Sequence, residues 1–289
     1  MTEGARELVR VIASQATSDG AGVKLRRSLG SSAFARLDPF LMLDEFFSDD
    51  PDDYIAGFPA HPHRGFETVT YMLDGRMQHK DHLGNTGDLG PGAVQWMTAG
   101  RGVIHSEMPQ QAEGRLRGFQ LWLNLPAAEK MQPAAYRDIP ATAIPELAFA
   151  GGQARVIAGT LVVDGQSRAG PVNAVPGSMA TDPLLVDLRL LPNAGADVPI
   201  APGYNALLYV YDGEMSVAGQ AVPERSAGIL GDGDQIGLSA GPGGGRALLM
   251  AARPIGEPIV QYGPFVMNTR EEIEQAMDDY RAGRLTDAA

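Results

Sequence analysis

A chain of 289 residues and 30.6 kDa is long enough for one large domain or two of ordinary size. Its 36 glycines and 21 prolines interrupt the chain too often for a helical bundle, and they predict an all-β protein of short strands. The formal net charge of −12 repels a phosphate backbone, so we expect no direct nucleic-acid binding. The absence of cysteine excludes thiolate ligands, so any bound metal must use His, Asp, Glu or backbone oxygen.

The N-terminal stretch MTEGARELVRVIASQ is charged and lacks the apolar run of a signal peptide. No stretch of the sequence approaches the roughly 20 apolar residues that a membrane-spanning helix needs. We therefore expect a cytoplasmic protein that does not bind a membrane.

Short runs of β-branched and aromatic residues, bounded by Gly, Pro, Asn or Asp, recur along the chain. Residues 66–73 (FETVTYML) predict a strand that ends in a hairpin-type turn at Asp74–Gly75. Further strands are predicted at 93–97, 117–123, 154–163, 184–191, 206–211, 227–230 and 246–252. Short strands at this density predict sandwiches or barrels.

The sequence contains a weak internal repeat. The segment 71–77 (YMLDGRM) reappears as residues 209–215 (YVYDGEM) in the second half of the chain. The two halves therefore look like copies of one fold, and the proline-rich stretch 133–145 marks the boundary between them. We expect an N-terminal domain over residues 1–135 and a C-terminal domain over residues 136–289.

The last patterned segment, residues 269–283, predicts a helix. Thr269 and Glu272 fit a capping box, and Gly283 can end the helix. One helical face carries Ile273, Ala276, Met277 and Tyr280. We expect a short C-terminal helix that packs through this face.

Three of the five histidines fall in two closely spaced pairs of metal-ligating residues. His61 and His63 are two residues apart, so in a strand both imidazoles point to the same side. His105 and Glu107 have the same spacing. If the two segments are neighbours across a sheet, three nitrogens and one carboxylate oxygen converge on one point. We therefore expect His61, His63, His105 and Glu107 to form a metal site in the N-terminal domain.

This ligand set restricts the metal and its role. Imidazole with one carboxylate suits Fe(II), Ni, Cu, Mn or Zn, whereas calcium and magnesium prefer oxygen ligands. Four protein ligands on an octahedral ion leave two positions open for a substrate or O₂. The sequence therefore predicts a catalytic or sensing site rather than a closed structural one.

Other residues near these segments are expected to have different roles. Glu67 shares the strand parity of the histidine pair, but because the expected site already has one carboxylate, we expect Glu67 to support it without binding the metal. His79 and His82 lie among charged residues, and we expect both at solvated or rim positions. Trp96 and Met97 are expected in the core.

The repeat also allows an expectation for the second copy. The positions that match the four expected ligands are Pro199, Ala201, Arg246 and Leu248. None of these side chains is a good metal ligand. We therefore expect the C-terminal domain to lack a metal site and to act as a scaffold, lid or interaction surface.

The segments that carry the expected ligands resemble those of the pirin family. The similar runs are HPHRGFETVTYMLDG at 61–75, PGAVQWMTAGRGVIHSEMP at 91–109, LDPFLMLDEFF at 37–47 and GPFVMNTREEIEQAMDDYRAGRL at 263–285. The resemblance implies a bicupin, in which two double-stranded β-helix (jelly-roll) barrels follow one another. It further implies iron bound by His61, His63, His105 and Glu107 in the N-terminal cupin, and a degenerate C-terminal cupin.

The same resemblance implies an activity. Many bacterial members of the family are described as quercetin 2,3-dioxygenases, so we expect an Fe(II)-dependent enzyme that cleaves a flavonol such as quercetin with O₂. In this reaction Glu107 would act as both metal ligand and base.

Two alternatives stay open. Other pirins are linked to transcriptional co-regulation or to control of metabolic enzymes, which implies a non-enzymatic, metal- or redox-dependent regulator that acts through protein–protein contacts. A different cupin reaction with zinc or manganese, such as isomerisation or hydrolysis, is the third hypothesis, because one fold hosts many chemistries.

Overall fold

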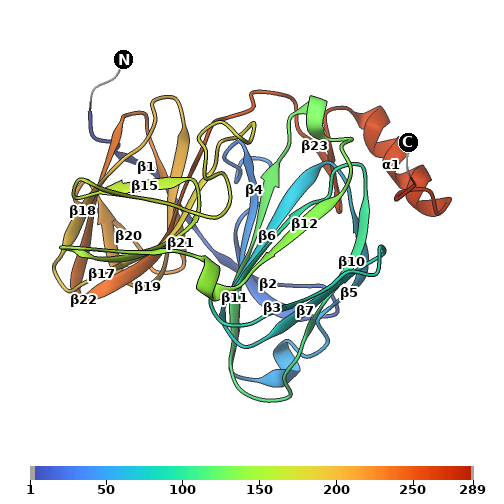
Figure 1. Cartoon of the computed structure of the whole chain (residues 1–289), viewed down its shortest axis with the longest axis horizontal. Coiled ribbons are helices and arrows are strands. Elements are labelled where there is room, and N and C mark those ends of the chain that lie inside the picture. The colour runs from blue at the N-terminus through green and yellow to red at the C-terminus, as the bar shows by residue number, and fades with distance from the viewer. Residues whose placement is uncertain (1–3, 288–289) are drawn as a thin grey trace. The chain divides into compact units, whose positions relative to one another are not determined.

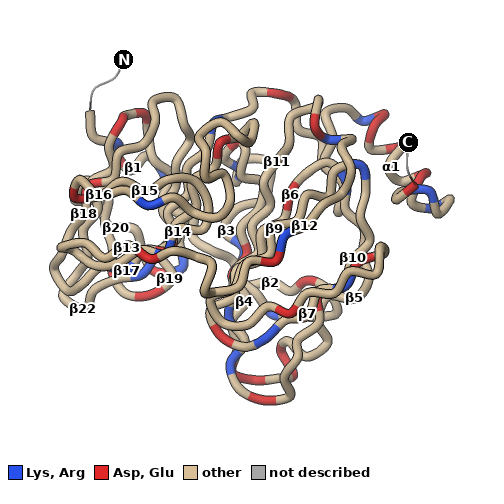
Figure 2. The backbone as a smooth tube through the Cα atoms, in the orientation of Figure 1, with Lys and Arg blue, Asp and Glu red and all other residues tan. Residues whose placement is uncertain are grey.

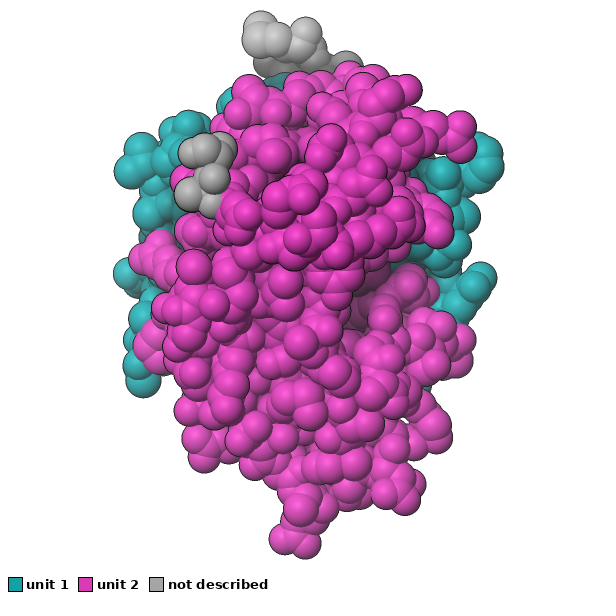
Figure 3. Space-filling view, turned by 90° about the vertical axis from the view of Figure 1, so that its right-hand side faces the viewer, with its two compact units in different colours: residues 1–15, 28–39, 142–254 teal, residues 16–27, 40–141, 255–289 magenta. Residues whose placement is uncertain are grey.

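The computed structural model describes residues 4–287, and strands make up most of the chain (Figure 1). Within these residues there are 24 strands and one α-helix, so the all-β prediction is confirmed. The chain divides into two compact units, each built from separate stretches of sequence (Figure 3). Unit 1 contains the described residues up to Gln15, residues 28–39 and residues 142–254. Unit 2 contains residues 16–27, residues 40–141 and the described residues from Ile255.

Unit 2 contains two larger sheets with a shared hydrophobic core. Its seven-stranded sheet runs in the order β12 (Ala135–Ile139), β9 (Val94–Thr98), β6 (Phe66–Asp74), β11 (Leu116–Asn124), β4 (Phe40–Ser48), β3 (Val23–Leu29) and β2 (Gln15–Asp19). Its four-stranded sheet runs in the order β5 (Phe58–His63), β10 (Val103–Pro109), β7 (Met77–Asp81) and β8 (Thr86–Leu89). Met72 and Leu116 of the first sheet and Met77 and Leu89 of the second belong to one buried cluster, so the two sheets face each other.

The turn at Asp74–Gly75 is a crossing between these sheets. Gly75 has a φ of 83°, in the left-handed region that favours glycine, so the predicted tight turn is present. However, β6 pairs with β9 and β11, whereas β7 pairs with β8 and β10. The tight turn is therefore present as predicted, but the two strands that it joins, β6 and β7, do not pair with each other as they would in a hairpin. Turn residues dictate only the local backbone, whereas the partner strand depends on contacts that are distant in sequence.

Unit 1 has one large sheet around a hydrophobic interior. The sheet runs in the order β1 (Leu8–Ala13), β21 (Ser226–Leu230), β19 (Asn205–Val217), β22 (Gln235–Ala252), β17 (Leu184–Leu190), β14 (Gly152–Ala158) and β13 (Glu146–Phe149), with β18 (Gly195–Pro199) on β22 and β20 (Gln220–Val222) on β19. Register shifts between Val210 and Asp212 and between Gly213 and Met215 bend the long pair of β19 and β22. The predicted strand at 154–163 is interrupted at Gly159, which has a φ of 73° and separates β14 from β15 (Thr160–Val163), the partner of β16 (Gln166–Ala169).

The C-terminal segment belongs to unit 2 and contains β23 (Val260–Tyr262), β24 (Phe265–Met267) and α1 (Arg270–Arg281). The predicted capping box is confirmed, because Thr269 Oγ1 accepts from Glu272 N–H at 3.2 Å while the Glu272 carboxylate accepts from Thr269 N–H at 2.9 Å. Ile273 and Ala276 are buried as predicted, whereas Tyr280 is 43% exposed. The helix therefore packs through a narrower face than the sequence indicates.

No described helix is long and apolar enough to cross a membrane. Figure 2 shows Lys and Arg interleaved with Asp and Glu along the chain in both units. Positive and negative side chains therefore occur in both units, and charge of one sign is not confined to one of them.

Lys130 joins three segments of unit 2 that are far apart in sequence. Its buried Nζ donates to the carbonyl oxygen of Gly65 at 2.7 Å, to Asn124 Oδ1 at 2.7 Å and to the carbonyl oxygen of Val266 at 3.1 Å. Burial lowers the pKa of Lys130 to about 8, so at pH 7 the side chain is still an ammonium with one N–H for each acceptor.

We expect Lys130→Met to lower the free energy of unfolding by about 2–4 kcal/mol, because it leaves three buried oxygens without a donor. Urea unfolding at pH 7 measures this change. Lys80→Met, at an exposed position of β7, is the matched control and should change stability by less than about 0.5 kcal/mol. Equal stabilities for the two variants would contradict the role of Lys130.

Glu67 on β6 makes the stability of the fold depend on pH. Its carboxylate is buried and accepts from Thr98 Oγ1 at 2.7 Å, and burial raises the pKa of Glu67 from 4.5 to about 7. Between these two pH values the folded protein holds a proton that the unfolded chain releases, so stability falls as pH rises through this window. Relative to Glu67→Gln, the wild type should lose on the order of 3 kcal/mol of unfolding free energy between pH 4.5 and pH 8. Urea unfolding of both proteins across this range is the measurement, and parallel pH profiles would show that Glu67 does not titrate in this way.

Candidate metal centre

The pairing of β5 with β10 brings the two expected ligand pairs together. In this antiparallel pair His61 lies directly opposite His105, and His63 lies opposite Val103. Residues opposite each other in an antiparallel pair point to the same face, so the three histidines project to one side. The register shifts between His105 and Glu107, which places Glu107 opposite Phe58.

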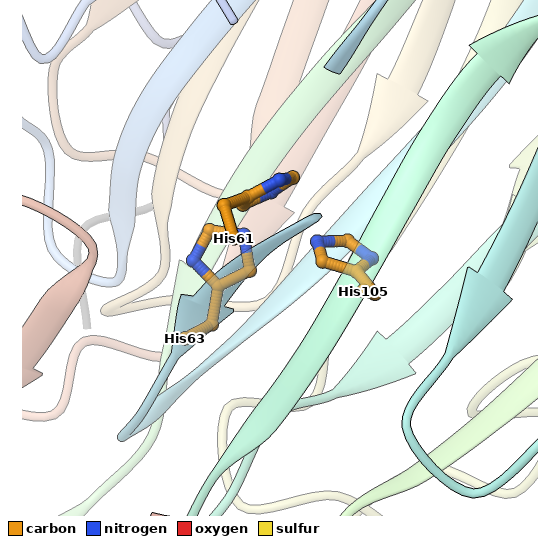
Figure 4. Close-up of side chains that lie close together, drawn as sticks. All are labelled: His61, His63 and His105. Carbon is orange, nitrogen blue, oxygen red and sulfur yellow. The ribbon is translucent and has the colours of Figure 1, made fainter. Parts of the chain in front are cut away.

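The three imidazoles converge on one point (Figure 4). One ring nitrogen of each of His61, His63 and His105 lies within 4.8 Å of those of the other two. The ring centroids are 4.7 Å apart for His61 and His63, 4.4 Å for His61 and His105, and 4.9 Å for His63 and His105. Among the residues that the structure describes, no other group of three or more His, Asp or Glu side chains is arranged in this way. These three histidines could therefore hold a metal ion.

Burial keeps two of the three rings neutral, which is the form that binds metals. Burial, followed by the neighbouring imidazoles, lowers the pKa of His63 and of His105 well below the usual value. The ring of His63 also packs against Phe66 at 5.1 Å and Trp122 at 5.3 Å between centroids. This apolar packing limits the access of water to the ring of His63.

Hydrogen bonds orient two of the rings. His61 Nδ1 lies 2.8 Å from the carbonyl oxygen of Pro59, and because a carbonyl can only accept, this nitrogen donates and Nε2 is the nitrogen left to bind a metal. His105 Nδ1 contacts His79 Nδ1 at 3.2 Å, while its buried Nε2 has no hydrogen-bond partner among the described residues. A buried imidazole nitrogen without a partner is the kind of atom that a metal ion satisfies.

Glu107 lies outside the group of three histidines. Its side chain is buried on the same face of β10 as His105, since residues at odd positions of this strand are buried and those at even positions are partly exposed. Glu107 Oε1 accepts from Thr70 Oγ1 of β6 at 3.0 Å. The carboxylate is therefore close to the cluster in the fold, and in this structure it is bonded to the opposite sheet.

His79 does not have the solvated position that we expected. It is fully buried on β7, directly opposite Glu107 across the pair with β10, and its ring contacts both His105 and Tyr136. The charged neighbour Lys80 suggested a solvated segment, but β7 alternates, with Met77 and His79 inside. This alternation is the sequence signal that could have placed His79 in the interior.

The other residues near the site lie where the sequence predicted them. His82 is exposed, and Trp96 and Met97 are buried in the core. Glu67 is buried and bonded to Thr98, outside the histidine group.

Comparisons with known proteins agree with this architecture. The Pirin family model matches residues 22–123, and that of the Pirin C-terminal cupin domain matches residues 185–286. A Pseudomonas aeruginosa protein whose name proposes a quercetin 2,3-dioxygenase is 54% identical over 286 residues, which cover 97% of this chain and 98% of that protein. A pirin-like protein of Caulobacter vibrioides is 48% identical over 281 residues, covering 97% of this chain and 99% of the relative. The crystal structure of quercetin 2,3-dioxygenase from Acinetobacter baumannii has a TM-score of 0.87 at 31% identity and covers 98% of this chain and 99% of that chain.

These matches extend over both halves of the chain. The first matched region contains the three converging histidines, and the second ends with helix α1. The resemblance carried by the sequence motifs is thus confirmed. The chain belongs to the pirin family and has its bicupin fold.

Proposed function

We propose that this protein is an Fe(II)-dependent dioxygenase that cleaves a flavonol such as quercetin with O₂. The observation that carries the proposal is the convergence of His61, His63 and His105 on one point, with His63 and His105 buried. The similarity to an Acinetobacter baumannii quercetin 2,3-dioxygenase, at 31% identity over nearly the whole chain, supports the choice of reaction.

In this proposal His61, His63, His105 and Glu107 hold the metal. Three imidazole nitrogens and one carboxylate oxygen suit a divalent transition metal and disfavour calcium or magnesium. Fe(II) is the choice because it is redox-active and reacts with O₂, and Ni, Cu, Mn and Zn are the alternatives that metal analysis distinguishes.

The residues around the site define how the protein would assist the reaction. Bound Fe(II) would supply Lewis acidity that stabilises the deprotonated 3-hydroxyl of the flavonol, together with the redox activity that O₂ chemistry needs. Glu107 would accept the hydroxyl proton on a carboxylate oxygen while Thr70 holds its Oε1. Phe66 and Trp122 would keep water away from the ligand rings by packing beside His63.

Anaerobic metal analysis, followed by addition of quercetin and air to the same sample, tests the proposal. We expect about one iron per chain, with loss of the flavonol absorbance and release of carbon monoxide, as the four-ligand site predicts. His61→Ala should lose both the iron and the turnover, because two imidazoles hold a divalent ion much more weakly than three. His82→Asn removes an exposed histidine and is the matched control, with iron and turnover retained. Stoichiometric iron without turnover would contradict the dioxygenase and favour a metal-dependent regulator.

Glu107→Gln tests the proposed base separately. The amide keeps the size of the side chain and can still accept from Thr70, but it cannot take a proton. We expect kcat per bound iron to fall by about 100-fold or more. Glu113→Gln, at an exposed position, is the control and should leave kcat unchanged. Turnover per iron at the wild-type rate in Glu107→Gln would rule out a base at this position.

A further inference from the structure

His79 is a buried histidine that the proposed ligand set does not use. It lies on β7, opposite Glu107, and its Nδ1 is 3.2 Å from the Nδ1 of His105. The other nitrogen of His79, Nε2, is buried and has no hydrogen-bond partner among the described residues. A fully buried imidazole with one bond, directed at an expected ligand, needs a reason to be there.

The contact between the two Nδ1 atoms can exist in two ways. One of the nitrogens carries the proton and donates, and the other accepts through its lone pair. If His105 donates, its Nε2 has a lone pair that faces the other two histidines. If His79 donates, His105 instead carries its proton on Nε2, and that nitrogen cannot bind a metal. The direction of a single hydrogen bond therefore decides whether His105 is a competent ligand.

Donation by His105 is the state that is compatible with the candidate metal site, because it leaves a lone pair on the ring nitrogen that faces His61 and His63 in Figure 4. In that state His79 carries its proton on Nε2, and the acidic side chains that act on His79 are Glu107, Asp81 and Asp138. The groups that act on His105 are the imidazoles of His61, His63 and His79, which offer no negative charge. Both Nε2 atoms are buried without a hydrogen-bond partner among the described residues, so the cost of burial is similar in the two states.

The contact between His79 and His105 differs in kind from the one that orients His61. The backbone carbonyl of Pro59 fixes the protonated nitrogen of His61, so this contact does not depend on a partner side chain. For His105 the protonated nitrogen is set instead by the side chain of His79, whose Nδ1 can either donate or accept. The tautomer of His105 therefore depends on a partner side chain that can be substituted.

Resting on the metal site proposed above, we propose that His79 is a positioning residue for the metal centre. It accepts the hydrogen bond from His105 Nδ1 and thereby holds His105 in the tautomer whose Nε2 is open to the ion. Its loss should weaken metal binding by about 10- to 100-fold, the range for residues that orient a ligating histidine.

Three substitutions separate this role from simple packing. His79→Asn places an amide oxygen near the position of the lost Nδ1, so it can still accept from His105. His79→Gln places its amide near the position of Nε2 and cannot replace that bond. His79→Leu fills the space without any acceptor.

The first measurement is the tautomer of His105 in the metal-free protein, by long-range ¹H–¹⁵N NMR of samples labelled at histidine. With five histidines in the chain the signals can be assigned by substitution. We expect His105 to carry its proton on Nδ1 in the wild type and in His79→Asn, and on Nε2, wholly or in part, in His79→Leu and His79→Gln. An Nε2 proton on His105 in the wild type, or an unchanged tautomer in His79→Leu, would overturn the proposal.

The second measurement is the dissociation constant for Co²⁺, read from its visible absorption, with the thermal unfolding of each metal-free variant recorded beside it. We expect affinity within about 3-fold of wild type for His79→Asn and a loss of about 10- to 100-fold for His79→Gln and His79→Leu. If His79→Asn and His79→Gln lose Co²⁺ affinity equally, and in proportion to their loss of thermal stability, His79 acts only through packing. If the wild type itself fails to bind Co²⁺, the proposed metal site is wrong. The NMR measurement on the metal-free protein still tests whether His79 sets the tautomer of His105.

Discussion

The convergence of the three histidines in the candidate metal centre depends on the antiparallel pairing of β5 with β10. This pairing sets His61 opposite His105 and puts His63 on the same face, and a slip of one residue would turn the histidines of one strand away from those of the other. Three imidazoles this close could not all be charged, and burial removes the conflict by holding His63 and His105 neutral. The fold can therefore assemble the group in its metal-binding form before any ion is present.

β5 lies at the edge of its sheet, so this constraint needs support from outside the sheet. An edge strand has a partner on one side only and is held less firmly than a central one. The residue after His63 supplies the support, since Arg64 N–H donates to the carbonyl of Pro264 and Arg64 O accepts from Val266 N–H. Its guanidinium also donates to Asp279 of α1 at 2.8 Å. The C-terminal segment thus fixes the end of the strand that carries two of the three histidines.

The parts of the site that sequence could predict are those set by local geometry. Strand alternation gave the convergence of His61 with His63, and the capping box at Thr269 located the helix, because each depends on residues within one strand or one helical turn. Pairing between distant segments determines two other features. It buries His79, and it places the residues from Ile255 onward in unit 2. No period or turn residue encodes such pairing, which is also why the turn at Gly75 suggested the wrong partner for β6.

The two units of the bicupin fill their interiors in different ways. Unit 1 has a hydrophobic cluster that includes Val198, Ile200 and Leu249, and its buried Asp187 is satisfied by the hydroxyl of Tyr211. Unit 2 buries His63, His79 and His105, with ring nitrogens that have no hydrogen-bond partner among the described residues. Unsatisfied buried polar atoms lower stability, whereas close-packed aliphatic side chains raise it. A ligand that binds only the folded protein offsets such a cost by mass action, so the interior of unit 2 has most to gain from a bound ion. The two cupins therefore differ in what they enclose: unit 1 encloses a large aliphatic cluster, and unit 2 encloses a group of histidines that a metal ion could satisfy.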